Sequence, residues 1–161
     1  MKLIVGLGNP GDIYAKNRHN VGFRVLDFLG LNFQKGFSGL YAKDSQFIYL
    51  KPQTFMNKSG DSVLAAASFH KIKPEDILVI HDELDLSFGT VRQKKGGGHA
   101  GHNGLRDITR VLGAEFSRIR IGISRPEHKG QVADYVLSNF SKEEEASLPD
   151  LIAQAIKLIQ N

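Results

Sequence analysis

The feature that most constrains the fold is the apolar run Ile77–Ile80, which is followed at once by the polar residues His81, Asp82 and Glu83. An uninterrupted apolar run of this length is typical of a strand that is buried on both faces in the middle of a sheet. Leu3–Val5 is a second such run, and it leads into a glycine-rich turn. Buried strands that end in polar residues predict an α/β protein.

Segments with helical spacing alternate with these strands. Val21–Leu29 places its apolar residues on one helical face, with Asn20 available as N-cap and Gly30 as terminator. A second helix is predicted to run through Val63 to Phe69, with Ser59 or Asp61 as its cap. Further helices are predicted over 103–112, ending at Gly113, and from the capping box Ser141–Glu144 onward, where Pro149 can shift the start.

Shorter strand-forming runs complete the predicted sheet. Leu40–Ala42 and Phe47–Leu50 flank a polar tetrapeptide and predict a hairpin, so the sheet is mixed. Two further strands are predicted over 90–93 and 118–123. The length of 161 residues suits one domain. The predicted fold is therefore a single α/β domain over 1–161, a twisted mixed sheet with helices on both faces.

Composition excludes several classes of protein. The sequence has no cysteine, which rules out a disulfide scaffold, a thiolate nucleophile and a cysteine-ligated zinc site. The apolar run near Met1 is too short for a signal peptide, and no stretch is long enough to span a membrane. We therefore expect a cytoplasmic protein. The net charge of +4 is compatible with a polyanionic partner, and eight basic residues fall between Arg92 and Arg125.

His19 is the first candidate for catalysis. It lies among polar residues just past the first strand, where α/β proteins present side chains for chemistry, and it can act as a general base. Asp82, the first carboxylate after a buried strand, is the best partner to fix its tautomer. Glu83 and Asp85 are interpreted as surface or turn residues.

Four asparagines fall at predicted junctions between strands and helices, where ligand sites of α/β proteins lie. They are Asn9, Asn20, Asn57 and Asn103. Each carboxamide can hold a peptide-like group or position a water, although helix capping is the commonest role of an asparagine such as Asn57.

Two glycine-rich segments invite other interpretations. Gly6–Gly11 fits the GxGxxG pattern, but the hairpin that follows favours a tight turn over a dinucleotide site. Lys94–Gly104 gives a backbone that can approach a ligand closely. His99 and His102 within it lack the partners that a metal site requires, so no metal is expected. No serine has the context of a nucleophile, and activated water is the default.

Six ordered blocks together resemble the bacterial peptidyl-tRNA hydrolase family. They are GLGNPG at 6–11, YxxxRHNxGF at 14–23, KPxTFMNxSG at 51–60, HDELDL at 81–86, GGGHAGHNGLRDI at 96–108 and RIRIGISRP at 118–126. Asn17 and Ala100 stand where that family often has Thr and Gly. The resemblance implies hydrolysis of the ester between a peptide and the 3′ ribose of tRNA, which recycles tRNA from interrupted translation, without a cofactor.

The resemblance also implies roles for individual residues. The implied catalytic group is His19, Asp82, Asn9 and Asn57. The implied substrate-binding group is Tyr14, Met56, Asn57, His102 and Asn103. Lys94 and Arg120 are implied to grip the 5′-phosphate of the tRNA. The expected partner is peptidyl-tRNA, bound at its acceptor stem and 3′ end by a monomer, with no membrane and no obligate protein partner.

Two functions from other classes stay open on the residues alone. Asp82, Glu83 and Asp85 could serve a Mg²⁺-dependent phosphoesterase, which would lose activity in EDTA. A non-catalytic RNA-binding module is the other alternative, although strand-borne aromatics for base stacking are few.

Overall fold

The computed structural model describes residues 1–160 and contains one seven-stranded sheet with five α-helices. The strands are β1 (Lys2–Gly6), β2 (Gln34–Gly36), β3 (Gly39–Lys43), β4 (Phe47–Pro52), β5 (Ile77–Glu83), β6 (Val91–Lys95) and β7 (Ser117–Gly122). The helices are α1 (Val21–Asp27), α2 (Ser59–Phe69), α3 (Asn103–Leu112), α4 (Val132–Val136) and α5 (Lys142–Gln160).

The sheet is mixed, as the hairpin predicted. Its strand order is β2-β3-β4-β1-β5-β7-β6, and the four central strands β4, β1, β5 and β7 run parallel. Both edges are antiparallel: β3 pairs with β4 in the predicted hairpin, and β6 pairs with β7. The carboxyl ends of the parallel strands therefore meet at one edge of the sheet.

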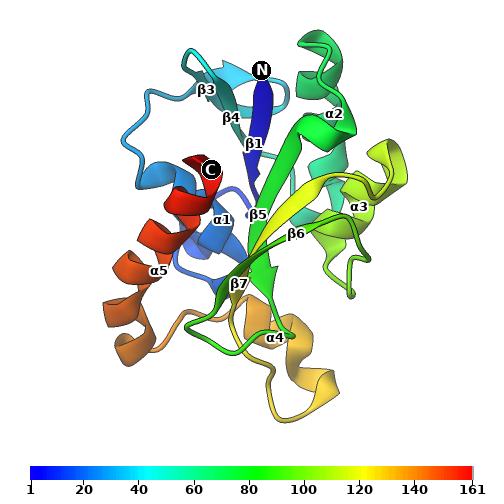
Figure 1. Cartoon of the computed structure of the whole chain (residues 1–161). Coiled ribbons are helices and arrows are strands. Elements are labelled where there is room, and N and C mark those ends of the chain that lie inside the picture. Colours follow the sequence, from blue (N-terminus) through cyan, green and yellow to red (C-terminus); the bar gives the residue numbers. More distant parts are fainter. Residues whose placement is uncertain (161) are drawn as a thin grey trace.

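Helices cover both faces of the sheet, which confirms the predicted architecture. Residues of α1 and α5 pack with Ile4, Ile80 and Ile119 in one core, and residues of α2 and α3 pack with Leu3, Val5 and Val79 in the other. Figure 1 shows α5 and α1 on one side, α2 and α3 on the other, and α4 beyond the carboxyl ends of the strands.

Gly22 brings α1 unusually close to the sheet. A Cβ at this position would lie 2.4 Å from both the carbonyl oxygen of Ile80 and the backbone nitrogen of Leu7. A Cβ at Gly6 would meet the Gly22 oxygen at the same distance. The absence of side chains therefore lets the start of α1, and the turn before it, lie directly against the ends of β1 and β5.

The predicted caps of α1 and α2 are wrong. Asn20 does not cap α1, because its carboxamide bonds the backbone of Asn9 in both directions, at 2.9 Å each. Neither Ser59 nor Asp61 caps α2. A carboxylate oxygen of Asp107 on α3 instead accepts the amide of Gly60 at 2.7 Å. Tertiary contacts replaced the local caps in both cases.

Other boundaries differ less. The Ser141–Glu144 capping box is present, and Pro149 lies inside α5 without shifting its start. The predicted strand 90–93 is β6, which begins one residue later and ends two residues later, and α3 ends before Gly113 as predicted. The short elements β2 and α4 were not predicted. Within residues 1–160, no helix is both long enough and apolar enough to traverse a lipid bilayer.

Candidate active site

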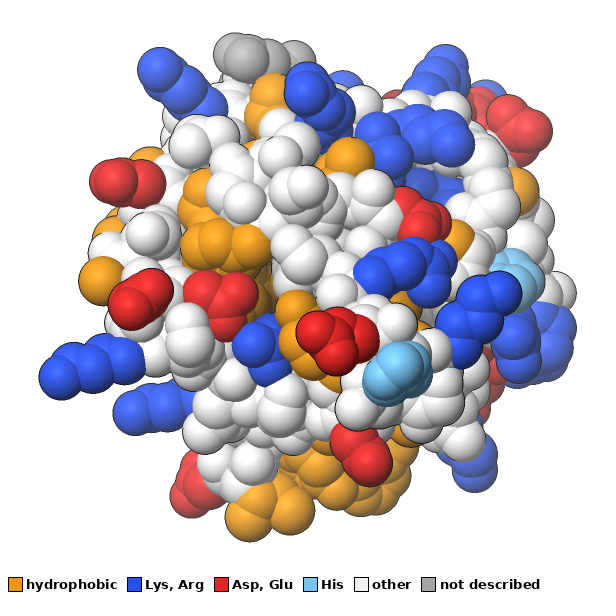
Figure 2. All heavy atoms as spheres, turned by 90° about the horizontal axis from the view of Figure 1, so that it is seen from below, with side chains coloured by type: hydrophobic (Ala, Val, Ile, Leu, Met, Phe, Trp, Pro, Cys, Tyr) orange, Lys and Arg blue, Asp and Glu red, His pale blue; other side chains and the backbone are white. Residues whose placement is uncertain are grey.

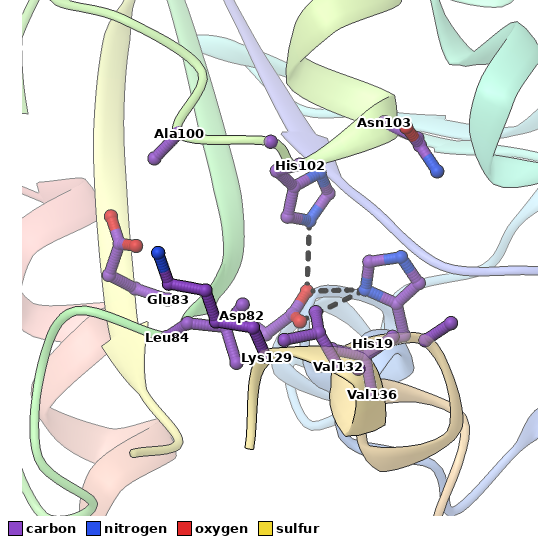
Figure 3. Close-up of a pocket in the computed structure, with 13 residues that line it drawn as sticks. His19, Asp82, Glu83, Leu84, Ala100, His102, Asn103, Lys129, Val132 and Val136 are labelled. Carbon is purple, nitrogen blue, oxygen red and sulfur yellow. Dashed lines mark hydrogen bonds and ion pairs between the residues drawn. The ribbon is translucent and has the colours of Figure 1, made fainter. Parts of the chain in front are cut away.

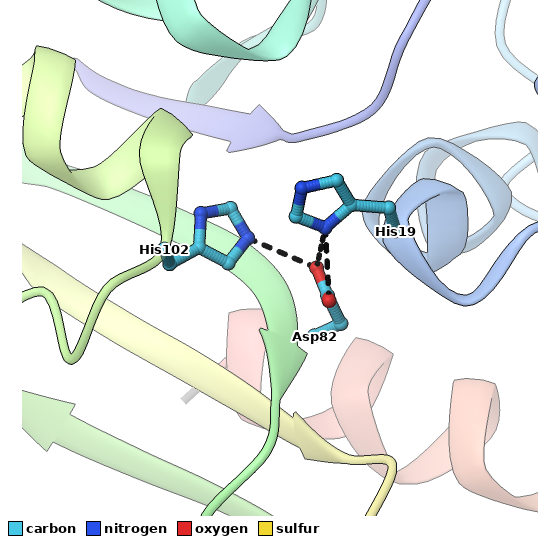
Figure 4. A group of neighbouring side chains, drawn as sticks. All are labelled: His19, Asp82 and His102. Atoms are coloured by element: carbon cyan, nitrogen blue, oxygen red, sulfur yellow. Dashed lines mark hydrogen bonds and ion pairs between the residues drawn. The ribbon is translucent and has the colours of Figure 1, made fainter. Parts of the chain in front are cut away.

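Three polar side chains meet at the carboxyl end of β5. His19 comes from a 3₁₀ turn, η2 (Arg18–Asn20), Asp82 from β5 itself, and His102 from the residue before α3. Nδ1 of His19 lies 3.0 and 2.9 Å from the two carboxylate oxygens of Asp82. Nε2 of His102 lies 2.9 Å from one of them. Figure 4 shows the Asp82 carboxylate held between the two rings.

The bond to Asp82 fixes the tautomer of neutral His19. A carboxylate can only accept, so Nδ1 of His19 carries the proton that it donates to Asp82. In the neutral ring Nε2 then has a free lone pair, and it faces away from Asp82 (Figure 4). That nitrogen is available to take a proton from water or from a substrate group.

His102 is fixed in the opposite tautomer. Its Nδ1 accepts the backbone amides of Gly104 and Leu105, at 3.1 and 3.3 Å, and so acts as the N-cap of α3. The neutral ring therefore carries its proton on Nε2 and donates it to Asp82. Asp82 thus receives two hydrogen bonds, and His102 has no free basic nitrogen.

The electrostatics of the trio favour an ionised Asp82. Burial would raise the pKa of Asp82, but the electrostatic interactions with His19 and His102 and the hydrogen bonds from both rings lower it well below its usual value of 3.8. Burial lowers the pKa of His19, whereas the Asp82 charge and hydrogen bond raise it, with a net pKa above 6.5. The carboxylate therefore strengthens His19 as a base.

A cavity of about 340 Å³ opens beside these side chains. Its lining includes His19, Asp82, His102 and Asn103, together with residues from the loop before α3 and from the segment around α4. Figure 3 shows Val132 and Val136 of α4 beside His19, and Lys129 and Glu83 on the far side of Asp82. His19 and Asp82 therefore form part of the cavity wall.

The predicted amide residues lie at different places around the site. Asn103 lines the cavity, whereas Asn9 and Asn57 are outside its lining. Asn9 is buried, and its Oδ1 accepts the amide of Met56 at 2.7 Å, which leaves its Nδ2 as a free donor. Asn57 is exposed on the turn η3 (Met56–Lys58). Asn20, the remaining junction asparagine, holds Asn9 in place.

Tyr14 and Met56 lie on the Asn9 side of the site. Tyr14 is half-buried and packs edge-on against the exposed ring of Phe55, with ring centroids 6.4 Å apart. Met56 is buried, and its sulfur lies against Gly104 of α3. Neither residue lines the 340 Å³ cavity.

Lys94 and Arg120 line a second cavity, of about 310 Å³. Its other lining residues are His81, Glu83, Asp85, Gly98, Ala100 and Arg118, of which Glu83 and Ala100 also line the first cavity. Lys and Arg side chains gather most densely on the right of Figure 2, the side on which α3 and β6 lie in Figure 1. The two cavities are therefore neighbours. His19 lines the first, and the basic side chains of Lys94, Arg118 and Arg120 line the second.

Arg118 and His81 are two residues of the second cavity that the sequence reasoning did not single out. Arg118 is buried, stacks on Phe116 and donates to the carbonyls of Gly97 and Gly98, so it fixes the glycine-rich loop. Burial and the neighbouring His102 lower the pKa of buried His81 to about 3, so it is neutral. The alternation of RIRIGI, which puts Arg118 and Arg120 on one face, was a usable signal.

Within residues 1–160, one group of side chains has the spacing of a metal site. The ligand atoms of His19, Asp82 and His102 lie within 4.8 Å of one another. Direct hydrogen bonds of 2.9 Å fill this space, whereas ligands on tetrahedral zinc would be separated by about 3.3 Å. Asp85 pairs with Arg125, and the cluster Asp82, Glu83 and Asp85 does not form in the described part of the chain.

Comparison with known proteins gives one consistent result. A family model described as "Peptidyl-tRNA hydrolase" matches residues 3–161. The peptidyl-tRNA hydrolase of Geotalea uraniireducens is 54% identical, over 99% of this chain and 88% of its own length. That of Sorangium cellulosum is 52% identical, over 99% of this chain and 77% of its own length. The crystal structure of peptidyl-tRNA hydrolase from Acinetobacter baumannii matches with a TM-score of 0.94 at 41% identity, covering 99% of this chain and 87% of that one.

Proposed function

The chain belongs to the peptidyl-tRNA hydrolase family, and we propose that His19 and Asp82 carry out its chemistry. The enzyme hydrolyses the ester between the C-terminus of a peptide and the 3′ ribose of tRNA, which releases free peptide and free tRNA. The observation that carries the assignment of residues is the bond from His19 Nδ1 to Asp82, at 2.9 Å.

In the proposed mechanism His19 is the general base. Its free Nε2 removes a proton from water as the water oxygen attacks the ester carbonyl. Asp82 stabilises the imidazolium that forms and keeps Nε2 turned toward the reacting water. As the tetrahedral intermediate breaks down, the bond to the ribose 3′ oxygen breaks, and this oxygen receives the proton from His19.

The amide groups are proposed to hold the substrate and the water. Asn9 can donate through Nδ2, because its Oδ1 is occupied by the amide of Met56. Asn57 and nearby backbone amides are proposed to stabilise the developing oxyanion or to hold the attacking water. Asn103 and His102 lie beside the cavity, and Tyr14 and Met56 flank the Asn9 side.

Lys94 and Arg120 are proposed to bind the 5′-phosphate of the tRNA. Both line the 310 Å³ cavity beside the site. Their charges would attract phosphate without reading base sequence. The proposed partner is thus the acceptor stem and 3′ end of peptidyl-tRNA, bound by a monomer in the cytoplasm.

The test is His19→Ala. A positioned general base contributes about 10² to 10⁴ in rate, so we expect kcat to fall by at least about 100-fold while the Kd for tRNA stays close to wild type. His70→Ala, which changes a histidine at the end of α2 away from the site, should keep wild-type kcat. Wild-type hydrolysis by His19→Ala would overturn the assignment.

The alternatives make different predictions. Loss of wild-type activity in EDTA would favour a Mg²⁺-dependent phosphoesterase, whereas the proposed mechanism predicts full activity. A non-catalytic RNA-binding module would bind peptidyl-tRNA without releasing peptide, and His19→Ala would then change nothing.

A further inference from the structure

Arg18, the residue next to His19, is a buried arginine that the proposed chemistry does not use. Only 9% of its surface is exposed. Its side chain reaches the segment that we call the strap, residues 129–139. The strap consists of the turn η5 (Lys129–Gln131), helix α4 and the residues Leu137, Ser138 and Asn139.

The strap forms one side of the cavity that contains His19. Five of its residues line that cavity: Lys129, Gly130, Val132, Ala133 and Val136. The first half of the strap is largely exposed, whereas Val136 is buried in the core. The width of the cavity therefore depends on how the later half of the strap is attached to the turn that carries His19.

Arg18 makes most of that attachment. Its Nη1 donates to Ser138 Oγ at 2.5 Å and to the Asn139 carbonyl at 2.9 Å. Its Nη2 donates to Glu144 of α5 at 2.9 Å. The guanidinium carbon lies 4.2 Å from the centre of the Tyr135 ring. A single planar group thus joins η2, α4 and α5.

The backbone around Arg18 supports the same connection. The amide of Arg18 donates to the Ser138 carbonyl at 3.0 Å. Next to it, Asn17 donates from Nδ2 to Asn139 Oδ1 at 2.9 Å. The Tyr135 hydroxyl donates to the Ile123 carbonyl and so attaches the strap to the segment after β7. These bonds orient the strap. The Arg18 guanidinium contacts the strap at two places, the ring of Tyr135 and the residues Ser138 and Asn139, and so links them.

We propose that Arg18 is a positioning residue that fixes the strap at a set distance from His19 and thereby shapes the cavity for substrate. The link to catalysis rests on the proposed function of His19. The guanidinium suits this task because its rigid fork can bond several oxygens while its face stacks on an aromatic ring, which an ammonium group cannot reproduce. His19 itself is held by Asp82, so Arg18 acts on substrate binding rather than on the base.

The test compares Arg18→Gln with Arg24→Gln. Arg24 makes two hydrogen bonds to Glu145, the neighbour of Glu144, at 2.6 and 2.8 Å, without contacting the strap. In Arg18→Gln we expect faster hydrogen exchange of the strap amides and a KM about tenfold higher. We expect kcat within about threefold of wild type and an unchanged pH profile. Arg24→Gln should leave strap exchange and KM at wild-type values.

Ser138→Ala provides a second test should Arg18→Gln fold poorly, because it removes one acceptor of the Arg18 guanidinium while η2 keeps its sequence. It also removes the bond from Ser138 Oγ to the Tyr135 carbonyl within the strap. It should raise strap exchange and KM in the same direction, by a smaller factor. Wild-type exchange and KM in folded Arg18→Gln would overturn the proposal, and so would a large fall in kcat with a shifted pH profile, which would place Arg18 at His19. Hydrogen exchange of the strap amides is measured without turnover. It therefore tests whether Arg18 fixes the strap even if His19 proves not to be the base.

Discussion

Asp82 is the residue on which the proposed chemistry depends most, because it accepts hydrogen bonds from two histidines in opposite tautomers. His102 is held from its other nitrogen by the amides of α3, whereas the other nitrogen of His19 is free. The same carboxylate therefore serves a fixed ring and a reactive one. This asymmetry identifies His19, and not His102, as the base.

Replacing Asp82 by Asn should move the pH dependence of the reaction. The Asp82 charge and hydrogen bond hold the pKa of His19 above 6.5 against the lowering effect of burial. The base is active only when deprotonated, so wild-type kcat/KM should rise with pH through a pKa above 6.5. In Asp82→Asn the effect of burial on the pKa of His19 dominates, so kcat/KM should begin to rise at a lower pH. The maximal rate should fall by about 10²- to 10⁴-fold.

The measurement is kcat/KM for a peptidyl-tRNA between pH 5 and 9. Asp76→Asn removes a carboxylate at the opposite end of β5 and serves as the control, with an unshifted profile. A profile of Asp82→Asn that rises at the wild-type pH would contradict the argument that Asp82 sets the pKa of His19.

Among the elements, α2 and α3 depend on each other through Asp107. Asp107 is buried on α3, accepts the Gly60 amide at the start of α2 and also bonds Arg110 at 3.0 Å. A Cβ at Gly60 would lie 2.6 Å from the Asp107 carbonyl oxygen, so the two helices approach closely there. The start of α2 is therefore capped by another helix rather than by its own residues.

Asp107→Ala should lower the free energy of unfolding, although Asp107 lies on α3 and is far in sequence from the helix start that it caps. It removes the acceptor for the Gly60 amide in a buried position, and we expect a loss of about 1 to 2 kcal/mol in the free energy of unfolding. Urea denaturation measures this difference. Asp61→Ala, which removes an exposed carboxylate in the first turn of α2, should change stability by less than about 0.5 kcal/mol. Equal losses in the two variants would refute the capping role of Asp107.

At the scale of the whole molecule, strand register gathers the basic side chains on one face. Lys94 pairs with Arg118, and Arg92 pairs with Arg120, across β6 and β7. His81 is the register partner of Arg120 across β5 and β7. Because side chains alternate along a strand, all five lie on the face that α3 covers only in part. The 310 Å³ cavity is therefore lined by side chains from three neighbouring strands, β5, β7 and β6.

Lys94→Gln and Arg120→Gln should each raise KM and reduce its dependence on salt. Losing one phosphate contact should reduce the slope of log KM against log salt by about one, with little change in single-turnover rate at saturating substrate. Lys95→Gln is the matched control, since Lys95 is the next residue of β6 and points to the opposite face. A large loss of single-turnover rate would instead place Lys94 or Arg120 at the chemistry.

Much of the fold followed from local patterns in the sequence. The buried runs Leu3–Val5 and Ile77–Ile80, the hairpin and the capping box of α5 all formed as predicted, because each depends on neighbouring residues. His19 and Asp82 were also identified from their places after strands, and the structure brings them within 2.9 Å. Their roles remain proposals that the variants above can test.

The sequence by itself determined the longer helices and strands, the mixed sheet and which chemical groups the chain carries, since periodicity and composition act over a few residues. The short elements β2 and α4 were not among them. Only the tertiary structure decided which groups meet. Contacts between Asp107 and α2, His102 and Asp82, and Arg18 and the strap join residues far apart in the chain. No local pattern encodes such pairings, because they arise from strand order and helix packing, which set distances between segments only after the whole chain is assembled.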